Sequence, residues 1–434
     1  MDFLEQADAR WLWHPFTSAD PADGPDPLIL VGGQGEWLVD SHGRRYLDGN
    51  SSIWCNLHGH QHPRLNAALE AQVRKIAHCS FLGTGNEPAS LLAQALVETL
   101  RGPSPLGFPD PIPRDSIPSR VFFSDNGSCA NEIAAKMAVQ FFRITGQPGR
   151  TDLVAFEGSY HGDTMLNVSL GGIGTFSEPY RALTLPCHVV PDLRALETRI
   201  AEGFQPAAIF LESALHGAGG MIPHPPGFMK RVADLAAKCG AFLVCDEVLA
   251  GFGRTGPFLG CFAEGIVPDF ITLSKGLTGG YLPLAITLAP QRVFEQFAGD
   301  YYSGKLLYHG HTYTAHPLAC AVALENLKIF HEEDTLGKVA ALRPAFEHGL
   351  DAFRKMPGVA EVRSRGLIGA IDLVARSRRG DTARAACTAM RPHGILTRPI
   401  GNTLVIMPPY CIRPENLTRL FEGVSRAIRQ VMSE

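Results

Sequence analysis

The chain has 434 residues, of which 45% are hydrophobic and 19% charged, and its formal net charge is -4 at pH 7. This composition is typical of a globular protein large enough to bury more than one domain's core. The small net charge and the lack of a dense Lys/Arg run give no indication of a basic surface that would bind nucleic acid or an anionic membrane. The composition therefore implies no polyanionic partner.

The N-terminus, MDFLEQADARWLWHP, is acidic where a secretory signal would be basic and then apolar. No uninterrupted apolar run approaches the roughly 18 to 20 residues that a membrane span needs. We therefore expect a cytoplasmic protein with no membrane partner. The ten cysteines are scattered without a C-x-x-C pair, which indicates neither a metal site nor a disulfide framework. Most of them are expected to be buried thiols.

Residues 1–62 are rich in turns, and GEWLVDSHGRRYLDG predicts a β-hairpin around residues 41–43. LNAALEAQVRKIAH, which follows Pro63, has apolar residues at helical spacing, and a second helix is predicted after Pro88. The Pro-rich stretch 102–119 has no apolar period and is predicted to be an exposed excursion between elements.

Strands and helices then alternate along the chain. Seven short apolar runs predict strands: RVFFS, DLVAF, CHVVP, AAIFLE, AFLVCD, DFITLS and PLAITLA. Amphipathic helices lie between several of them, and this alternation favours an α/β domain with a mostly parallel sheet. After about residue 318 the pattern changes to a long helix, mixed strands, a turn at Gly401-Asn402 and a final helix, which indicates a smaller α+β domain.

We therefore predict three segments along the chain. Residues 1–62 form an N-terminal arm and part of the small domain, residues 63–325 form the large α/β domain, and residues 326–434 complete the small α+β domain. Both termini thus contribute to the smaller domain.

Two charged residues, Asp246 and Lys275, each follow an apolar run, AFLVC and DFITL. The carboxyl ends of parallel strands are where sites form in such sheets. A buried ammonium is costly, so Lys275 needs a partner, a lowered pKa or a covalent role such as an imine with an aldehyde. Pyridoxal phosphate fits this pair, because it needs a lysine for that bond and a carboxylate at its pyridine nitrogen. The alternative is an Asp helix cap beside a surface Lys.

A phosphate site is predicted where the strand RVFFS leads into the helix that begins SDNGSCANE. Gly127, Ser128 and the first helical N–H groups would form the cradle, although a simple capped helix start has the same residue types. The other Gly-rich string, SLGGIGTF, is a poor dinucleotide fingerprint, which disfavours an NAD-linked oxidoreductase.

Four further residues have both a functional and a plain structural interpretation. Tyr160 follows the strand DLVAF, where its ring would stack on a pyridine or simply pack. Thr312, in GHTYTAHP, is a second candidate phosphate donor. Arg398 is a candidate bidentate clamp for a substrate carboxylate or else a surface Arg. Arg254 lies between glycines, and we favour a structural ion pair for it.

With these motifs the chain resembles the class III (omega-type) aminotransferases of the fold-type I pyridoxal phosphate enzymes. The resemblance runs nearly end to end, through WHPFTS, LDGNSSIWCNLHGHQHP, SDNGSCANEIAAKMA, YHGDT, GAGGM, DEVLAGFGRTG, LSKGLTGG, YHGHTYTAHPLACA and RPIGNTLVIMPPYCI. DEV-x-x-GFGRTG with a downstream SKG is specific for the class, whereas WHPFTS, SSIW and RPIGNTLVIMPP indicate its biotin-pathway members.

The resemblance implies roles for the residues at the predicted site. Lys275 would bond the cofactor aldehyde and shuttle the proton, and Asp246 would hold the pyridine nitrogen. Tyr160 would stack on the ring, while Gly127 and Ser128 would bind the phosphate.

The resemblance also implies a homodimer with shared active sites, in which Thr312 reaches the phosphate of the partner subunit. Arg398 would bind the carboxylate of an oxo-acid substrate, and Trp54 would line its channel. The implied reaction converts 8-amino-7-oxononanoate to 7,8-diaminononanoate, with adenosylmethionine or lysine as donor. Another diamine, omega-amino acid or amino ketone is the alternative substrate, and a scaffold module without catalysis is a further alternative.

The chain departs from the family pattern at three positions. Phe16 replaces the Tyr after WHP, and Ile53 replaces the first of two adjacent Trp residues. Both changes predict weaker use of adenosylmethionine relative to lysine. His216 replaces the Gln before GAGG, from where a ring nitrogen could still donate to the cofactor's phenolic oxygen.

Overall fold

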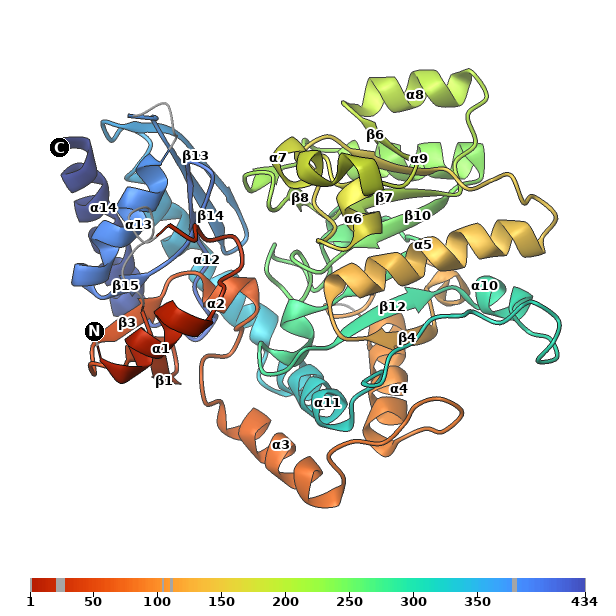
Figure 1. The fold of residues 1–434 in the computed structure, drawn as a ribbon, viewed down its shortest axis with the longest axis horizontal. Helices are drawn as coiled ribbons and strands as arrows, with labels where there is room; N and C mark the ends of the chain where they lie inside the picture. Colours follow the sequence, from red (N-terminus) through yellow and green to blue (C-terminus); the bar gives the residue numbers. More distant parts are fainter. Residues whose placement is uncertain (1, 21–27, 104, 110–111, 377–380, 434) are drawn as a thin grey trace.

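A seven-stranded sheet, in the order β4-β12-β11-β10-β7-β5-β6, forms the centre of the larger part of the molecule (Figure 1). The computed structural model describes residues 2–20, 28–103, 105–109, 112–376 and 381–433. The strands are β4 (Arg120–Ser124), β5 (Leu153–Phe156), β6 (Cys187–Val190), β7 (Ala208–Glu212), β10 (Phe242–Asp246), β11 (Phe270–Leu273) and β12 (Ala285–Ala289). They coincide with the seven predicted strands, and every neighbouring pair is parallel except the two that β12 makes. The prediction of an α/β fold with a mostly parallel sheet is confirmed.

The central strands are buried on both faces, because helices cover the sheet. Every residue of β7 and β10 is buried, as expected for parallel strands between helical layers. The helix α5 (Gly127–Ile144) packs against β11 and β12 and buries Ile133 and Met137. The other helices and short elements of this part are α3 (Pro63–Lys75), α4 (Glu87–Arg101), η1 (Arg114–Ser116), α6 (Met165–Leu170), α7 (Gly174–Ser177), η2 (Glu178–Leu183), α8 (Leu193–Ala201), β8 (Leu215–His216), β9 (Ile222–Pro223), α9 (Phe228–Cys239), η3 (Gly260–Glu264), η4 (Lys275–Thr278) and α10 (Gln291–Gln296).

Segments from the two ends of the chain lie together in the smaller part (Figure 1). One sheet has the order β1-β2-β3-β15 and a second the order β13-β14-β17-β16. Their strands are β1 (Leu30–Gln34), β2 (Trp37–Asp40), β3 (Arg45–Asp48), β13 (Val359–Arg365), β14 (Ile368–Leu373), β15 (Ile395–Leu396), β16 (Pro399–Ile400) and β17 (Thr403–Ile406). The helices here and at the junction are α1 (Phe3–Trp11), α2 (Ser51–Trp54), α11 (Pro317–Glu332), α12 (Thr335–Asp351), α13 (Thr382–Met390), η5 (Arg391–His393) and α14 (Pro414–Ser433).

The strand β15 pairs in parallel with β3, with Ile395 opposite Leu47. This pairing joins residues from the C-terminal third to the N-terminal segment in one sheet. It is consistent with the predicted small domain from both termini, whose boundaries near residues 62 and 325 remain predictions. The predicted hairpin at 41–43 is present as β2 and β3, and the predicted turn at Gly401 joins β16 to β17.

Two expectations need correction. Part of the Pro-rich stretch 102–119 lies outside the described residues, but Leu106, Phe108 and Ile117 within it are buried. The ring of Phe108 packs on Phe262 with 4.5 Å between centroids, so isolated apolar residues anchor a stretch that has no periodicity. All ten cysteines are free, yet five are buried and five only half-buried.

Among the described residues, no helix combines the length and apolarity needed to cross a membrane.

Candidate active site

The two charged strand-end residues lie at the same edge of the central sheet. The strands β10 and β11 are adjacent and parallel, with Asp246 opposite Thr272. Lys275 follows three residues later in η4, with a positive φ of 43°. Asp246 and Lys275 line one cavity of about 240 Å³. The predicted convergence of the acid and the lysine is thus found at the carboxyl ends of the strands.

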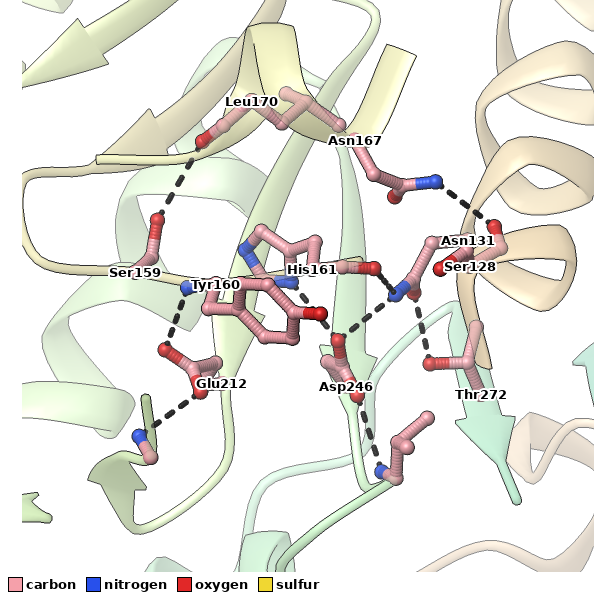
Figure 2. A network of polar contacts seen from close by, with 12 residues as sticks. Ser128, Asn131, Ser159, Tyr160, His161, Asn167, Leu170, Glu212, Asp246 and Thr272 are labelled. Atoms are coloured by element: carbon pink, nitrogen blue, oxygen red, sulfur yellow. Dashed lines mark hydrogen bonds and ion pairs between the residues drawn. The ribbon is translucent and has the colours of Figure 1, made fainter. Parts of the chain in front are cut away.

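Asp246 is held in place by three hydrogen-bond donors and is almost fully buried. Its Oδ2 accepts from Asn131 Nδ2 at 2.8 Å and from His161 Nδ1 at 2.9 Å, and its Oδ1 accepts from the backbone N–H of Val248 at 3.0 Å. Figure 2 shows Asn131 and His161 converging on this carboxylate. Asn131 is itself oriented by Thr272, whose hydroxyl donates to its Oδ1 at 2.9 Å. Such donors favour the charged carboxylate.

Lys275 presents a buried amine to the cavity. Burial lowers the pKa of Lys275, and the nearby carboxylates Asp246 and Glu212 oppose this shift. Among the described residues its Nζ donates no hydrogen bond, and its contact is the ring of Trp54, with Nζ 4.8 Å from the ring centroid. A desolvated lysine with a lowered pKa is a better nucleophile toward a carbonyl.

The start of α5 forms another wall of the cavity. The helix is capped by Asn126, whose side chain accepts from the N–H of Cys129 at 3.0 Å, and Gly127 and Ser128 line the cavity. A Cβ at Gly127 would lie 2.8 Å from Val248 Cγ1, so this position has no room for a side chain. The N–H groups and dipole of this 18-residue helix make its start a suitable site for a phosphate.

Tyr160 and Trp54 also line this cavity. The hydroxyl of Tyr160 donates to Asp163 Oδ2 at 2.7 Å, and its backbone N–H donates to Glu212 Oε2 at 3.0 Å. Burial, together with Asp163, raises the pKa of Tyr160. The phenol therefore stays protonated, and Tyr160 is held both at its hydroxyl and at its backbone N–H.

A second cavity, of about 590 Å³, contains Phe16, Ile53 and Arg398. The Nη2 of Arg398 donates to the carbonyl oxygen of Phe16 at 2.6 Å. The ring of Phe16 packs edge-on against Phe176 at 5.4 Å, and Phe176 contacts Tyr160 at 6.0 Å. Ile53 lines this cavity and its sequence neighbour Trp54 lines the first, so this short segment borders both cavities.

Two predicted residues are not brought to the first cavity of this chain. Thr312 is exposed and does not line it. His216 does not line the cavity either; its Nδ1 lies 3.3 Å from Glu212 Oε2, and its ring lies against His224 with 4.7 Å between centroids.

Sequence reasoning missed Glu212 and Asn131. Glu212 ends the predicted strand AAIFLE and accepts from the N–H of Gly217 at 2.9 Å as well as from Tyr160. An acid at a strand end was the signal that selected Asp246, so the same signal could have found Glu212. Asn131 carries no comparable signal, because its role depends on the packing of α5 on the sheet.

Arg254 has a structural role, but no ion pair is seen. It is fully buried, and its guanidinium donates to the carbonyl oxygens of Pro408 at 2.8 Å and Asn56 at 3.3 Å. Within the described residues it pairs with no carboxylate, and burial lowers the pKa of Arg254.

Comparisons with known proteins agree with this geometry. The family model described as aminotransferase class III matches residues 19–428. The adenosylmethionine-8-amino-7-oxononanoate aminotransferase of Geobacter sulfurreducens is 38% identical, over 99% of this chain and 98% of its own length. The crystal structure of the enzyme of the same name from Methanocaldococcus jannaschii superposes with a TM-score of 0.90 at 34% identity, covering 98% of each chain. An amine transaminase from an uncultivated Pseudomonas species, in a pyridoxal phosphate-bound form, gives a TM-score of 0.88 at 30% identity, over 97% of this chain and 99% of that one.

Fold and cavity together define a pyridoxal phosphate-dependent transaminase of fold type I. The chain belongs to the class III aminotransferases. It is therefore an enzyme with small-molecule substrates, and the alternatives of a scaffold module and an NAD-linked oxidoreductase are wrong.

The residues at the first cavity fit the cofactor. A buried amine that has no hydrogen-bond acceptor among the residues the structure describes, a fixed carboxylate and a helix start with no room for a side chain are the groups that an aldehyde, a pyridine nitrogen and a phosphate require.

Proposed function

We propose that this transaminase converts 8-amino-7-oxononanoate to 7,8-diaminononanoate. The activity for which the relatives are named supports this substrate. The observation that carries the proposal is the pair of cavities bordered by residues 53 and 54, one with the amine of Lys275 and one with the guanidinium of Arg398. A substrate with an amino ketone at one end and a carboxylate at the other would match this arrangement of charges.

The cofactor, when bound, supplies the electron sink that stabilises negative charge at the substrate carbon. Lys275 would hold it and then carry the proton to and from that carbon, as a general acid and base with a lowered pKa. Asp246 would hold the pyridine nitrogen in its protonated form. Gly127 and Ser128 would bind the phosphate, and Tyr160 would lie on the ring.

Arg398 would bind the substrate carboxylate, and Trp54 would border the path to it. In the structure the guanidinium of Arg398 donates to backbone oxygens of residues 15 and 16. A carboxylate accepts a stronger, charge-assisted hydrogen bond than a backbone carbonyl, so substrate would displace the segment around Phe16 from this contact.

An omega-transaminase that acts on other amines is the second candidate function. The solved structure of an (S)-enantioselective omega-transaminase from Thermomicrobium roseum has an equal TM-score of 0.90, and that of the Pseudomonas amine transaminase is nearly as similar in fold. A panel of amino donors and acceptors, assayed with purified holoenzyme, distinguishes the two. Turnover of simple amines and none of 8-amino-7-oxononanoate would favour the second candidate.

We expect the half-reaction with the amino donor to be faster with lysine than with adenosylmethionine. Phe16 lacks the hydroxyl of the family's Tyr, and a net hydrogen bond of about 1 kcal/mol corresponds to roughly fivefold in binding. Phe16→Tyr should therefore improve the half-reaction with adenosylmethionine about fivefold, whereas Phe176→Tyr, which adds a hydroxyl to the neighbouring ring, should not. Half-reaction spectra with each donor provide the measurement. Fast conversion of the wild type by adenosylmethionine and none by lysine would contradict this prediction.

We also propose that the enzyme is a homodimer with shared active sites. Large apolar side chains are exposed on two segments near Thr312: Val73, Ile76, Leu82, Tyr308 and Tyr313. The segments contact one another through the rings of His78 and Tyr313, 5.0 Å apart. An exposed apolar surface of this kind is typical of a subunit interface, and it would carry Thr312 to the partner's phosphate site.

Thr312→Ala should weaken cofactor binding about 10- to 100-fold, because a hydrogen bond to a charged group is worth roughly 1.5–3 kcal/mol. Co-expression with Lys275→Ala then tests whether sites are shared. A hybrid dimer has one complete site only if Thr312 acts across the interface, so a statistical mixture should recover about a quarter of wild-type activity. Thr418→Ala, an exposed threonine on α14, should behave as wild type. No recovery in isolated hybrids would show that Thr312 serves its own chain.

A further inference from the structure

The segment that borders the two cavities has a backbone conformation that L-residues rarely adopt. Ser51, Ser52, Ile53 and Trp54 have φ values of 45°, 46°, 64° and 73°. Four consecutive non-glycine residues therefore follow a left-handed turn, closed by the N–H of Trp54 donating to the carbonyl of Asn50 at 2.9 Å. A β-branched residue such as Ile53 is particularly disfavoured in this region. Such a turn persists only where its surroundings hold it, and it is typically found at functional sites.

Asp48 provides one restraint on this turn. It is 3% exposed, and its Oδ1 accepts from the backbone N–H of Ser52 while its Oδ2 accepts from the Ser52 hydroxyl, both at 2.8 Å. Both oxygens of this carboxylate therefore bind Ser52, in the middle of the turn, and Oδ2 also accepts from His60 Nε2 at 3.0 Å. The indole Nε1 of Trp54 adds a bond to Asn50 Oδ1 at 2.9 Å.

Arg254 provides a second restraint from the large sheet's side. Its Nη2 donates to the hydroxyl of Ser51 at 3.3 Å, and that hydroxyl donates to the carbonyl of Met407 at 2.6 Å. The beginning of the turn is thereby tied to the strand end after β17. Asp48 and Arg254 together fix the turn at its first two residues.

The turn decides where the next two side chains go. Trp54 lines the first cavity, where its ring lies 4.8 Å from Lys275 Nζ, and Ile53 lines the second cavity with Arg398. A right-handed backbone at these positions would turn the two side chains in other directions, because reversal of φ and ψ reverses the sense of the turn.

We propose that Asp48 is a positioning residue, which holds the left-handed turn at Ser52 and so sets the wall between the Lys275 cavity and the Arg398 cavity. This inference rests on the proposed function only in taking Arg398 as the carboxylate site. With the turn held, a substrate can reach the amine and the guanidinium at once. With the turn released, Trp54 and Ile53 no longer shape the path between them, and the selection for a remote carboxylate is lost.

Two substitutions of Asp48 separate positioning from a direct effect of charge. Asp48→Asn removes the charge, but its amide can accept from the N–H of Ser52 and donate to the Ser52 hydroxyl. Asp48→Ala removes both bonds to Ser52 and also the contact with His60. If the Asp48 charge acted directly on a bound carboxylate, both variants would bind that carboxylate more tightly, since a repulsion would be gone.

The experiment compares kcat/KM of each holoenzyme for 8-amino-7-oxononanoate and for a chain-matched amino ketone without the carboxylate. We expect Asp48→Ala to lower the ratio of the two kcat/KM values about tenfold or more, mainly through KM, and Asp48→Asn to retain it within about twofold. Borohydride labelling of Lys275 should be unchanged in both.

Asp40→Ala is the matched control, because Asp40 is a buried carboxylate that holds the neighbouring 41–43 turn by accepting from the N–H groups of His42 and Arg44. It should change thermal stability and leave the ratio unchanged.

Ser52→Gly provides an independent variant if Asp48→Ala does not fold. Glycine adopts the observed φ without strain, so the protein should fold, but the turn loses its side-chain bond and its rigidity, and the ratio should again fall. An unchanged ratio in Ser52→Gly and in Asp48→Ala, or equal losses in Asp48→Asn and Asp48→Ala, would overturn the proposal. If the wild type does not accept 8-amino-7-oxononanoate, the proposed function fails by itself. The ratio of kcat/KM values is then measured with two other substrates that the wild type does accept, one with a remote carboxylate and a chain-matched one without it.

Discussion

Lys275→Ala should abolish turnover, with a loss of at least about 10³-fold, since general acid–base catalysis alone typically contributes 10² to 10⁴. The substitution removes both the amine that would hold the cofactor and the group that would move the proton. The buried position of Lys275 and its lowered pKa are the physical basis for this expectation. Steady-state transamination assays give the magnitude. Borohydride reduction followed by peptide mass spectrometry should place the pyridoxyl mass on Lys275 in the wild type.

Two controls sharpen this test. Lys275→Arg keeps a cation beside Trp54 but cannot form the bond to the cofactor aldehyde, so it should be as inactive as the alanine variant. Lys328→Ala removes an exposed lysine on α11 and should leave activity and labelling unchanged. Substantial turnover in Lys275→Ala, or the label on another lysine, would refute the assignment of the amine.

Asp246→Asn should lower kcat by about 10² to 10³, the range seen when one preorganised electrostatic group is removed from an active site. The neutral amide cannot stabilise a protonated pyridine nitrogen. The amide would also place an N–H against one of the three donors that converge on this side chain, from Asn131, His161 and the backbone of Val248. Single-turnover kinetics and the visible absorbance of the holoenzyme provide the measurements.

Asp269→Asn is the matched control for Asp246→Asn. Asp269 is a half-buried aspartate of the same sheet, just before β11, where its Oδ2 accepts from the N–H of Leu243 at 2.8 Å and it pairs with Arg292. Its substitution should lower thermal stability by a comparable amount and leave kcat within about twofold, because Asp269 lies at the opposite end of the strands from the cavity. Equal losses of kcat in the two variants would mean that Asp246 acts only through stability.

The positions of the seven strands and the convergence of Asp246 and Lys275 could be predicted from the sequence, because both depend on local patterns. Short apolar runs identify the buried strands, and parallel strands place their carboxyl ends at one edge. The sequence also predicted the phosphate cradle, since Gly127 and Ser128 follow a strand and begin a helix. Each of these signals lies within about ten residues of chain.

Other features depend on contacts between distant segments, which no local pattern encodes. Asn131 supports Asp246 only because α5 lies on the sheet, and the link from Arg398 to Phe16 joins residues nearly the whole chain apart. The left-handed turn at 51–54 is contrary to the intrinsic preference of its residues, so sequence propensity would assign it a different backbone. The cofactor contact of His216 stays a prediction, since its ring lies against His224 and Glu212 outside the lining of the first cavity.

The parallel pairing of β15 with β3 has a consequence for synthesis of the protein. The edge of β3 receives its partner only when Ile395 has left the ribosome, roughly 350 residues after Leu47. At about 5–20 residues per second this interval is roughly 17–70 s. During that time the N-terminal strands present an unpaired edge, which is a template for pairing with other chains. The nascent N-terminal segment is therefore a candidate for chaperone protection, and small-domain folding must be post-translational or nearly so.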